Sequence, residues 1–116
     1  MPELISLKFR SYAGLEDVFN TLRLGSRWGK RVQEGDRVTL LDEFNQVFGS
    51  AEVLSVYTGE KDAIIQEHAR FNHNIAEQML PESQASEIMV KRLRRVYGSG
   101  YFKKAKTMTA IYLRRI

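Results

Sequence analysis

The spacing of apolar residues changes once along this 116-residue chain, near Thr58-Gly59. Before that point, short runs of alternating or β-branched apolar residues predict strands at 4–9, 37–41 and 47–57. After it, apolar residues recur at steps of three and four, as in amphipathic helices. A β-branched and aromatic run at 107–113 predicts the last strand. This order suits a small α+β domain, a mixed-sheet barrel of about five or six strands with about two or three helices packed at one side.

Turn and breaker residues divide the chain further. Residues 13–20 predict a short helix or turn, with a brief strand at 21–24. Glu34-Gly35-Asp36 has the composition of a tight turn, and Gly49-Ser50 predicts a bulge or bend in the strand that contains it. A helical stripe follows, with a break at 72–74; it consists of Ile64, His68, Phe71, Ile75 and Met79.

A second helix is predicted from Pro81 to about Tyr97, and Gly98 stands where helices commonly end. The loop after it, followed by Lys103, Lys104 and Lys106, reads as a flexible basic finger. The apolar arc of this helix consists of Ala85, Ile88, Met89, Leu93 and Val96.

The segment 21–37 surrounds the single tryptophan, Trp28, with cations. A planar ring among guanidinium groups can stack on a base while the cations neutralise phosphates, although Trp28 could equally be a hydrophobic lid on the barrel. Arg23 could bind a phosphate or carboxylate, or form a structural ion pair with Glu52. The candidate phosphate contacts in this segment are Arg23, Arg27, Lys30 and Arg31.

Charge is distributed unevenly. The first ninety residues carry nine Lys and Arg against all fourteen Asp and Glu, whereas residues 91–116 carry nine Lys and Arg and no acid. Such asymmetry favours a polyanionic partner, and we expect RNA or another nucleic acid. A solvated helix face, or a face that docks on an acidic protein, is the alternative. The candidate phosphate contacts within residues 91–116 are Lys91, Arg94, Arg95 and Lys103.

Several site classes are not expected. The chain has no cysteine, which excludes disulfides and thiolate-bound metals. His68 and His73 would lie about 140° apart on one helix, so they do not form a metal pair. We expect no metal or cofactor. No signal peptide and no membrane-length apolar stretch is seen, which predicts a cytoplasmic protein without membrane contact, and we expect a monomer.

The order of these motifs resembles the ASCH domain, a family of the PUA-like superfamily of small β-barrels. The matching segments are Thr21-Leu22-Arg23, Gly35-Asp36-Arg37-Val38, Phe48-Gly49-Ser50-Ala51-Glu52-Val53 and Glu67-His68-Ala69. The resemblance covers residues 1–116 as one domain. It implies a cleft between barrel and helices that holds RNA or a nucleotide. Some small ASCH proteins hydrolyse acetylcytidine.

The resemblance also locates the catalytic residues of those hydrolases, a lysine, a threonine and a glutamate. Thr21 matches the threonine, but Val18 stands at the lysine position and Asn72 at the glutamate position. Valine and asparagine cannot supply that acid–base chemistry. We therefore expect a nucleic-acid-binding module with a cleft of Thr21, Arg23, Trp28 and Asn72. The alternative is a metal-independent hydrolase of a modified nucleoside, or a ribonuclease, that uses Thr21 and Tyr101.

Overall fold

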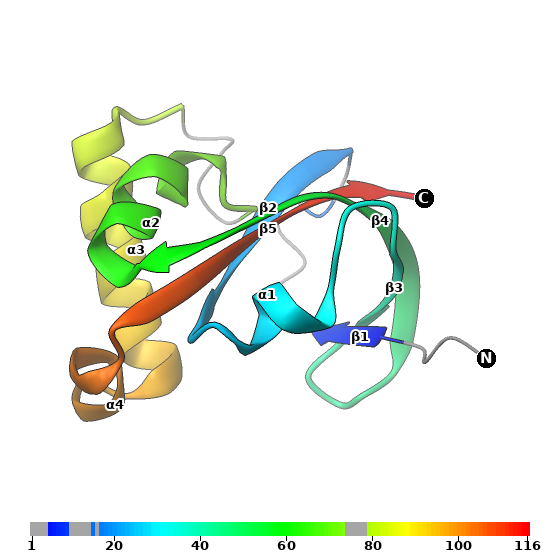
Figure 1. Ribbon diagram of the computed structural model, residues 1–116, viewed down its shortest axis with the longest axis horizontal. Coiled ribbons are helices and arrows are strands. Elements are labelled where there is room, and N and C mark those ends of the chain that lie inside the picture. The colour runs from blue at the N-terminus through cyan, green and yellow to red at the C-terminus, as the bar shows by residue number, and fades with distance from the viewer. Residues whose placement is uncertain (1–4, 10–14, 16, 74–78) are drawn as a thin grey trace.

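The predicted strands join in one five-stranded mixed sheet (Figure 1). The computed structural model describes residues 5–9, 15, 17–73 and 79–116. In spatial order the strands run β1-β3-β4-β5-β2; only β1 and β3 are parallel, and every other pair is antiparallel. Their bounds are β1 (Ile5–Lys8), β2 (Val18–Leu24), β3 (Arg37–Leu41), β4 (Val47–Glu60) and β5 (Thr107–Arg115).

Four α-helices and one 3₁₀ turn accompany the sheet in the described part of the chain. Helices α2 and α3 lie together at the end of the molecule away from β1 and β3 (Figure 1). The helical elements are α1 (Arg27–Arg31), α2 (Lys61–His68), η1 (Ala69–Phe71), α3 (Glu82–Tyr97) and α4 (Ser99–Lys104). None of these helices is long and apolar enough to cross a membrane. The architecture is the expected α+β domain with a curled mixed sheet.

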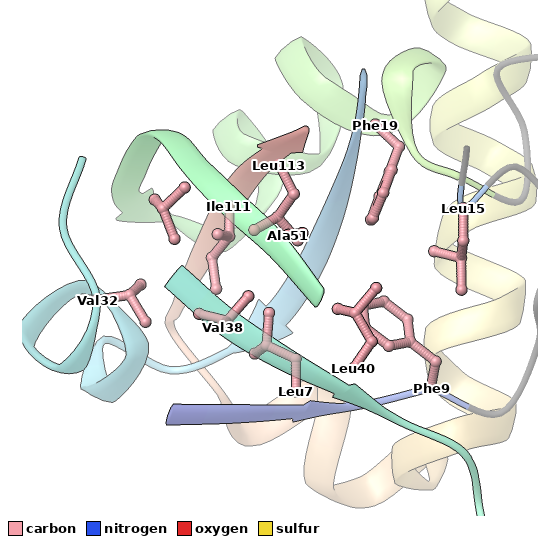
Figure 2. Packing of buried hydrophobic residues seen from close by; sticks show 11 residues of the cluster. Leu7, Phe9, Leu15, Phe19, Val32, Val38, Leu40, Ala51, Ile111 and Leu113 are labelled. Carbon is pink, nitrogen blue, oxygen red and sulfur yellow. The ribbon is translucent and has the colours of Figure 1, made fainter. Parts of the chain in front are cut away.

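Two hydrophobic cores lie on opposite faces of the sheet, because successive side chains of a strand point to opposite sides. Along β2, Phe19 enters one core and Leu22 the other. The barrel core, whose side chains point toward one another in Figure 2, contains Leu7, Phe9, Leu15, Phe19, Val32, Val38, Leu40, Ala51, Val53, Ile111 and Leu113. The helix core, between sheet and helices, contains Leu22, Ile64, Ile65, Ala69, Ala85, Met89, Leu93, Phe102, Met108 and Ala110.

The edge strands β1 and β2 approach each other and nearly close the barrel. Arg23 Nη2 on β2 donates a hydrogen bond to the carbonyl oxygen of Lys8 on β1, with an N–O distance of 2.9 Å. The Phe9 and Phe19 rings, which follow β1 and belong to β2 respectively, meet edge to face with 6.3 Å between centroids. A side chain therefore bridges the two edges, between which the described residues form no backbone ladder.

Turn chemistry was predicted well. Gly35 adopts a φ of 91°, which favours glycine, and Asp36 accepts a hydrogen bond from the Gln33 amide in the same turn. Gly98 ends α3 at a φ of 88°. The ladder between β3 and β4 shifts register opposite Leu40 and Leu41, which leaves Phe48 as the extra residue, beside the predicted bend at Gly49.

Three local predictions were wrong. Val18, Phe19 and Asn20 belong to β2 and not to a helix, because they pair with β5. The helical stripe does not reach Met79, which is 90% exposed; the helix stops at His68, and Ile75 lies outside the described residues. The segment 99–104 is a short helix and not the predicted loop, since Phe102 of α4 anchors in the helix core. The basic segment around Trp28 also contains a short helix, α1, which packs on the sheet.

Candidate functional site

A pocket of about 510 Å³ opens between helix α3 and the two edge strands of the barrel, β1 and β2. The ends of β1 and β2 form one wall, α3 forms the other, and the segment after η1 forms the floor. Its lining combines apolar and aromatic side chains with a few cations, an amide and a carboxylate, a composition typical of ligand pockets. The lining residues are Lys8, Phe9, Thr21, Leu22, Arg23, Glu43, Asn72, His73, Met89, Arg92, Leu93, Val96 and Tyr97.

Arg23 is the central polar group of this pocket. Its Nε donates to Thr21 Oγ1 at 3.1 Å and its Nη2 donates to the Lys8 carbonyl at 2.9 Å. The guanidinium carbon also lies 5.0 Å from the Phe9 ring centroid and 5.8 Å from that of Trp28. Neutral acceptors and ring faces hold the group in place without neutralising its charge.

The charge of Arg23 has no internal counterion in the described residues, where no carboxylate lies within salt-bridge distance of it. Burial lowers the pKa of the Arg23 guanidinium, because desolvation disfavours the charged form, while the nearby Tyr97 acts in the opposite direction. Glu52, the candidate partner, instead pairs with Arg114. A bound anion would supply a counterion that the described residues do not provide.

The floor of the pocket depends on a contact between β2 and the segment after η1. Asn20 and Asn72 form an isolated parallel bridge, and the His73 amide donates to the Asn20 carbonyl at 3.2 Å. This bridge holds Asn72 and His73 against the barrel opening, where the His73 ring meets Phe9 edge to face at 5.2 Å. The predicted cleft residues Thr21, Arg23 and Asn72 are thus brought together.

Helix α3 faces the pocket with residues one helical turn apart. Met89 and Leu93 belong to the helix core, and their neighbours Arg92, Val96 and Tyr97 point into the pocket. Val96 is 37% exposed and Ile88 is 39% exposed, so the buried arc is narrower than predicted. A cation on α3 therefore joins Arg23 across the opening, and it is Arg92 instead of the predicted Lys91, Arg94 or Arg95.

Trp28 lies on α1 and packs against the barrel core. It is partly buried, its ring is 4.6 Å from the Arg31 guanidinium carbon, and it does not line the pocket. This geometry corresponds to the lid and not to an open stacking platform. Trp28 contacts Arg23, which does line the pocket, with 5.8 Å between its ring centroid and the guanidinium carbon.

No family model matches the sequence, and no curated protein matches it either. Among solved structures, protein EF3133 from Enterococcus faecalis V583, a DUF984 protein, is 9% identical with a TM-score of 0.62, over 98% of this chain and 76% of its own. A serine-to-alanine mutant of ZmASCH from Zymomonas mobilis is 15% identical with a TM-score of 0.51, over 94% of this chain and 66% of its own. The protein has an ASCH-type fold. Hypothetical protein PH0355 is also similar, at 13% identity and a TM-score of 0.59, over 98% of this chain and its whole length.

In this ASCH-type fold the other predicted cations lie outside the pocket, exposed on helices. They are Arg27, Lys30 and Arg31 on α1, Lys91, Arg94 and Arg95 on α3, and Lys103 on α4. Tyr101, on α4, is also outside the pocket that holds Thr21, so the structure does not bring these two together as a catalytic pair. Each of the two basic segments, 21–37 and 91–116, contributes one cation to the pocket lining: Arg23 and Arg92.

Six polar or aromatic lining residues were missed from the sequence: Lys8, Phe9, Glu43, His73, Arg92 and Tyr97. Arg92 could have been found, since it stands on the border of the α3 apolar arc beside Met89 and Leu93. Lys8 and Glu43 carried no signal, because only the curling of the sheet brings the end of β1 and the β3–β4 turn to α3.

The three positions that the sequence resemblance matches to hydrolase residues, Val18, Thr21 and Asn72, do not all lie in the pocket. Val18 is 56% exposed at the start of β2 and does not line the pocket, whereas Thr21 and Asn72 do. Thr21 Oγ1 accepts the hydrogen bond from Arg23 Nε. Within the described ranges, no three His, Asp or Glu side chains gather as a metal site would need.

Proposed function

We propose that the protein is an ASCH-like module that binds single-stranded RNA and holds one nucleotide of it in the pocket. The observation that carries this proposal is the Arg23 guanidinium, fixed by neutral partners and without a carboxylate among the described residues. Phosphate, like carboxylate, fits the geometry of a guanidinium group. Arg92 and Lys8 add positive charge around it.

The rest of the pocket suits the neutral part of a nucleotide. Phe9 and Tyr97 offer ring surface to a base. Glu43 is the one carboxylate among the described lining residues, and it can accept a hydrogen bond from a sugar hydroxyl. RNA fits better than a free nucleotide, because exposed cations continue beyond the pocket on α3 and α4.

The test measures binding of a fluorescein-labelled octaadenylate RNA by anisotropy at several salt concentrations. Arg23→Met should weaken binding about tenfold or more, the effect of losing a charge-assisted hydrogen bond. Arg37→Met is the matched control, since Arg37 is exposed at the start of β3 and does not line the pocket. Arg92→Met repeats the test on a half-buried lining side chain that belongs to neither hydrophobic core.

Affinity should fall with salt, by a slope of about 0.7 in log–log form for each phosphate neutralised. Affinity that does not respond to salt, or Arg23→Met binding as well as Arg37→Met, would reject the proposal. Thr21-dependent release of acetate from acetylcytidine, absent in Thr21→Ala, would instead establish a hydrolase in the same pocket.

A further inference from the structure

Tyr101 continues the aromatic wall of the pocket onto the surface of α4. Its ring stacks on that of Tyr97 with 6.4 Å between centroids and 22° between planes, and Tyr97 itself lines the pocket. Tyr101 nevertheless stays 66% exposed. Its neighbour Phe102, which anchors α4 in the helix core, is 4% exposed. Packing α4 therefore requires Phe102 and gives no reason for an aromatic ring at position 101.

Exposed cations accompany Tyr101 on α4 and on the neighbouring α3. Lys103 and Lys104 follow it on α4 and are exposed. Arg94 joins them from α3, since its guanidinium carbon lies 5.9 Å from the Phe102 ring centroid. The sequence from Ile88 to Ile116 contains no acid, so no local carboxylate of this stretch neutralises these cations. An exposed ring flanked by such charge suits a base and its phosphates better than an apolar protein surface.

We propose that Tyr101 is the stacking position for the nucleotide next to the one in the pocket, on a single-stranded RNA whose phosphates lie along Arg94, Lys103 and Lys104. This inference rests on the proposed function, because it takes one nucleotide to be bound at Arg23. It adds a second base position and a path for the strand, from the pocket past Tyr97 onto α4. Stacking tolerates any base, so this position adds affinity without adding sequence preference.

The experiment compares one ligand that can reach only the pocket with one that reaches both positions. Adenosine 5′-monophosphate is the short probe, measured by its displacement of the labelled octaadenylate RNA, which is the long probe. Tyr101→Leu keeps an apolar side chain but removes the π face, and it should weaken octaadenylate binding by about 5-fold to 100-fold. It should leave adenosine 5′-monophosphate binding unchanged, and Tyr101→Phe should bind both probes as the unaltered protein does.

Two controls separate this inference from the proposed function. Tyr57→Leu removes another tyrosine, 47% exposed, which stacks on His68 away from the pocket lining, and it should leave both affinities unchanged. Arg23→Met should weaken binding of both probes.

If Arg23→Met weakens binding of both probes while Tyr101→Leu weakens binding of neither, the second base position is wrong and the proposed pocket stands. If Tyr101→Leu weakens both probes equally, Tyr101 acts on the pocket and the second position is overturned. If the unaltered protein binds neither probe, both proposals fall.

Discussion

His68 is a buried histidine held from two sides. Its Nδ1 shares a hydrogen bond of 2.7 Å with the Tyr112 hydroxyl, and Tyr57 stacks on its ring at 4.9 Å. Its Nε2 is buried without a hydrogen-bond partner. Burial lowers the pKa of His68 from its ordinary value of 6.5, although the neighbouring Glu67 acts to raise it. A proton on this ring is therefore less favourable in the folded protein than in the unfolded chain.

At this residue scale we predict that acid weakens the fold through His68. Below pH 6.5 the unfolded chain takes up a proton that the folded ring resists, so the free energy of unfolding falls as the pH drops from 6.5 toward the lower folded pKa. The slope from this one group is at most about 1.4 kcal/mol per pH unit. Urea unfolding of the protein and of His68→Gln at pH 7.5 and 5.5 measures it. A stability difference between the two that does not change with pH would contradict the prediction.

At the scale of elements, helix α1 packs so closely on strand β4 that one of its positions requires glycine. An ideal Cβ on Gly29 would overlap Thr58 Oγ1. That hydroxyl lies 3.1 Å from Thr109 Oγ1, which in turn donates to the Gly25 carbonyl at 2.8 Å. Gly29→Ala should therefore lower the free energy of unfolding by about 1–3 kcal/mol, although alanine favours a helix by about 1 kcal/mol.

Gly100→Ala is the matched control for this element, because nothing lies within 4 Å of a Cβ added to that α4 glycine. It should raise the free energy of unfolding by about 0.4–1 kcal/mol. Chemical denaturation of both variants gives the comparison. Equal stabilisation by the two substitutions would show that α1 does not need its close approach to β4.

At the scale of the whole molecule, the last strand in the sequence is internal to the sheet. β5 pairs with β4 on one side and with β2 on the other. It also gives Ile111 and Leu113 to the barrel core and Met108 and Ala110 to the helix core. A chain that ends at residue 106 should lose cooperative unfolding altogether, as thermal circular dichroism would show. A cooperative transition in this truncated chain would contradict the central role of β5.

The element boundaries that sequence predicted best depend on local chemistry. The turn at Gly35 and the helix end at Gly98 both need a positive φ, and the residue type reports that need directly. The strand at 37–41 and the helix ending at Tyr97 follow from their apolar spacing. Val18, Phe19 and Asn20 were misassigned, because their pairing with residues 112–114 is invisible to any local window.

The sequence by itself determined which residues are apolar, where the chain turns, and that residues 91–116 carry cations and no acid. Only the tertiary structure decided that Arg23 and Arg92 line one pocket, and that Glu52 pairs with Arg114 and not with Arg23. The physical reason is that local spacing fixes which side of an element is buried. Which elements meet depends on strand pairs formed between residues distant in sequence, and in this protein those pairs curl the sheet until its edges meet at Arg23.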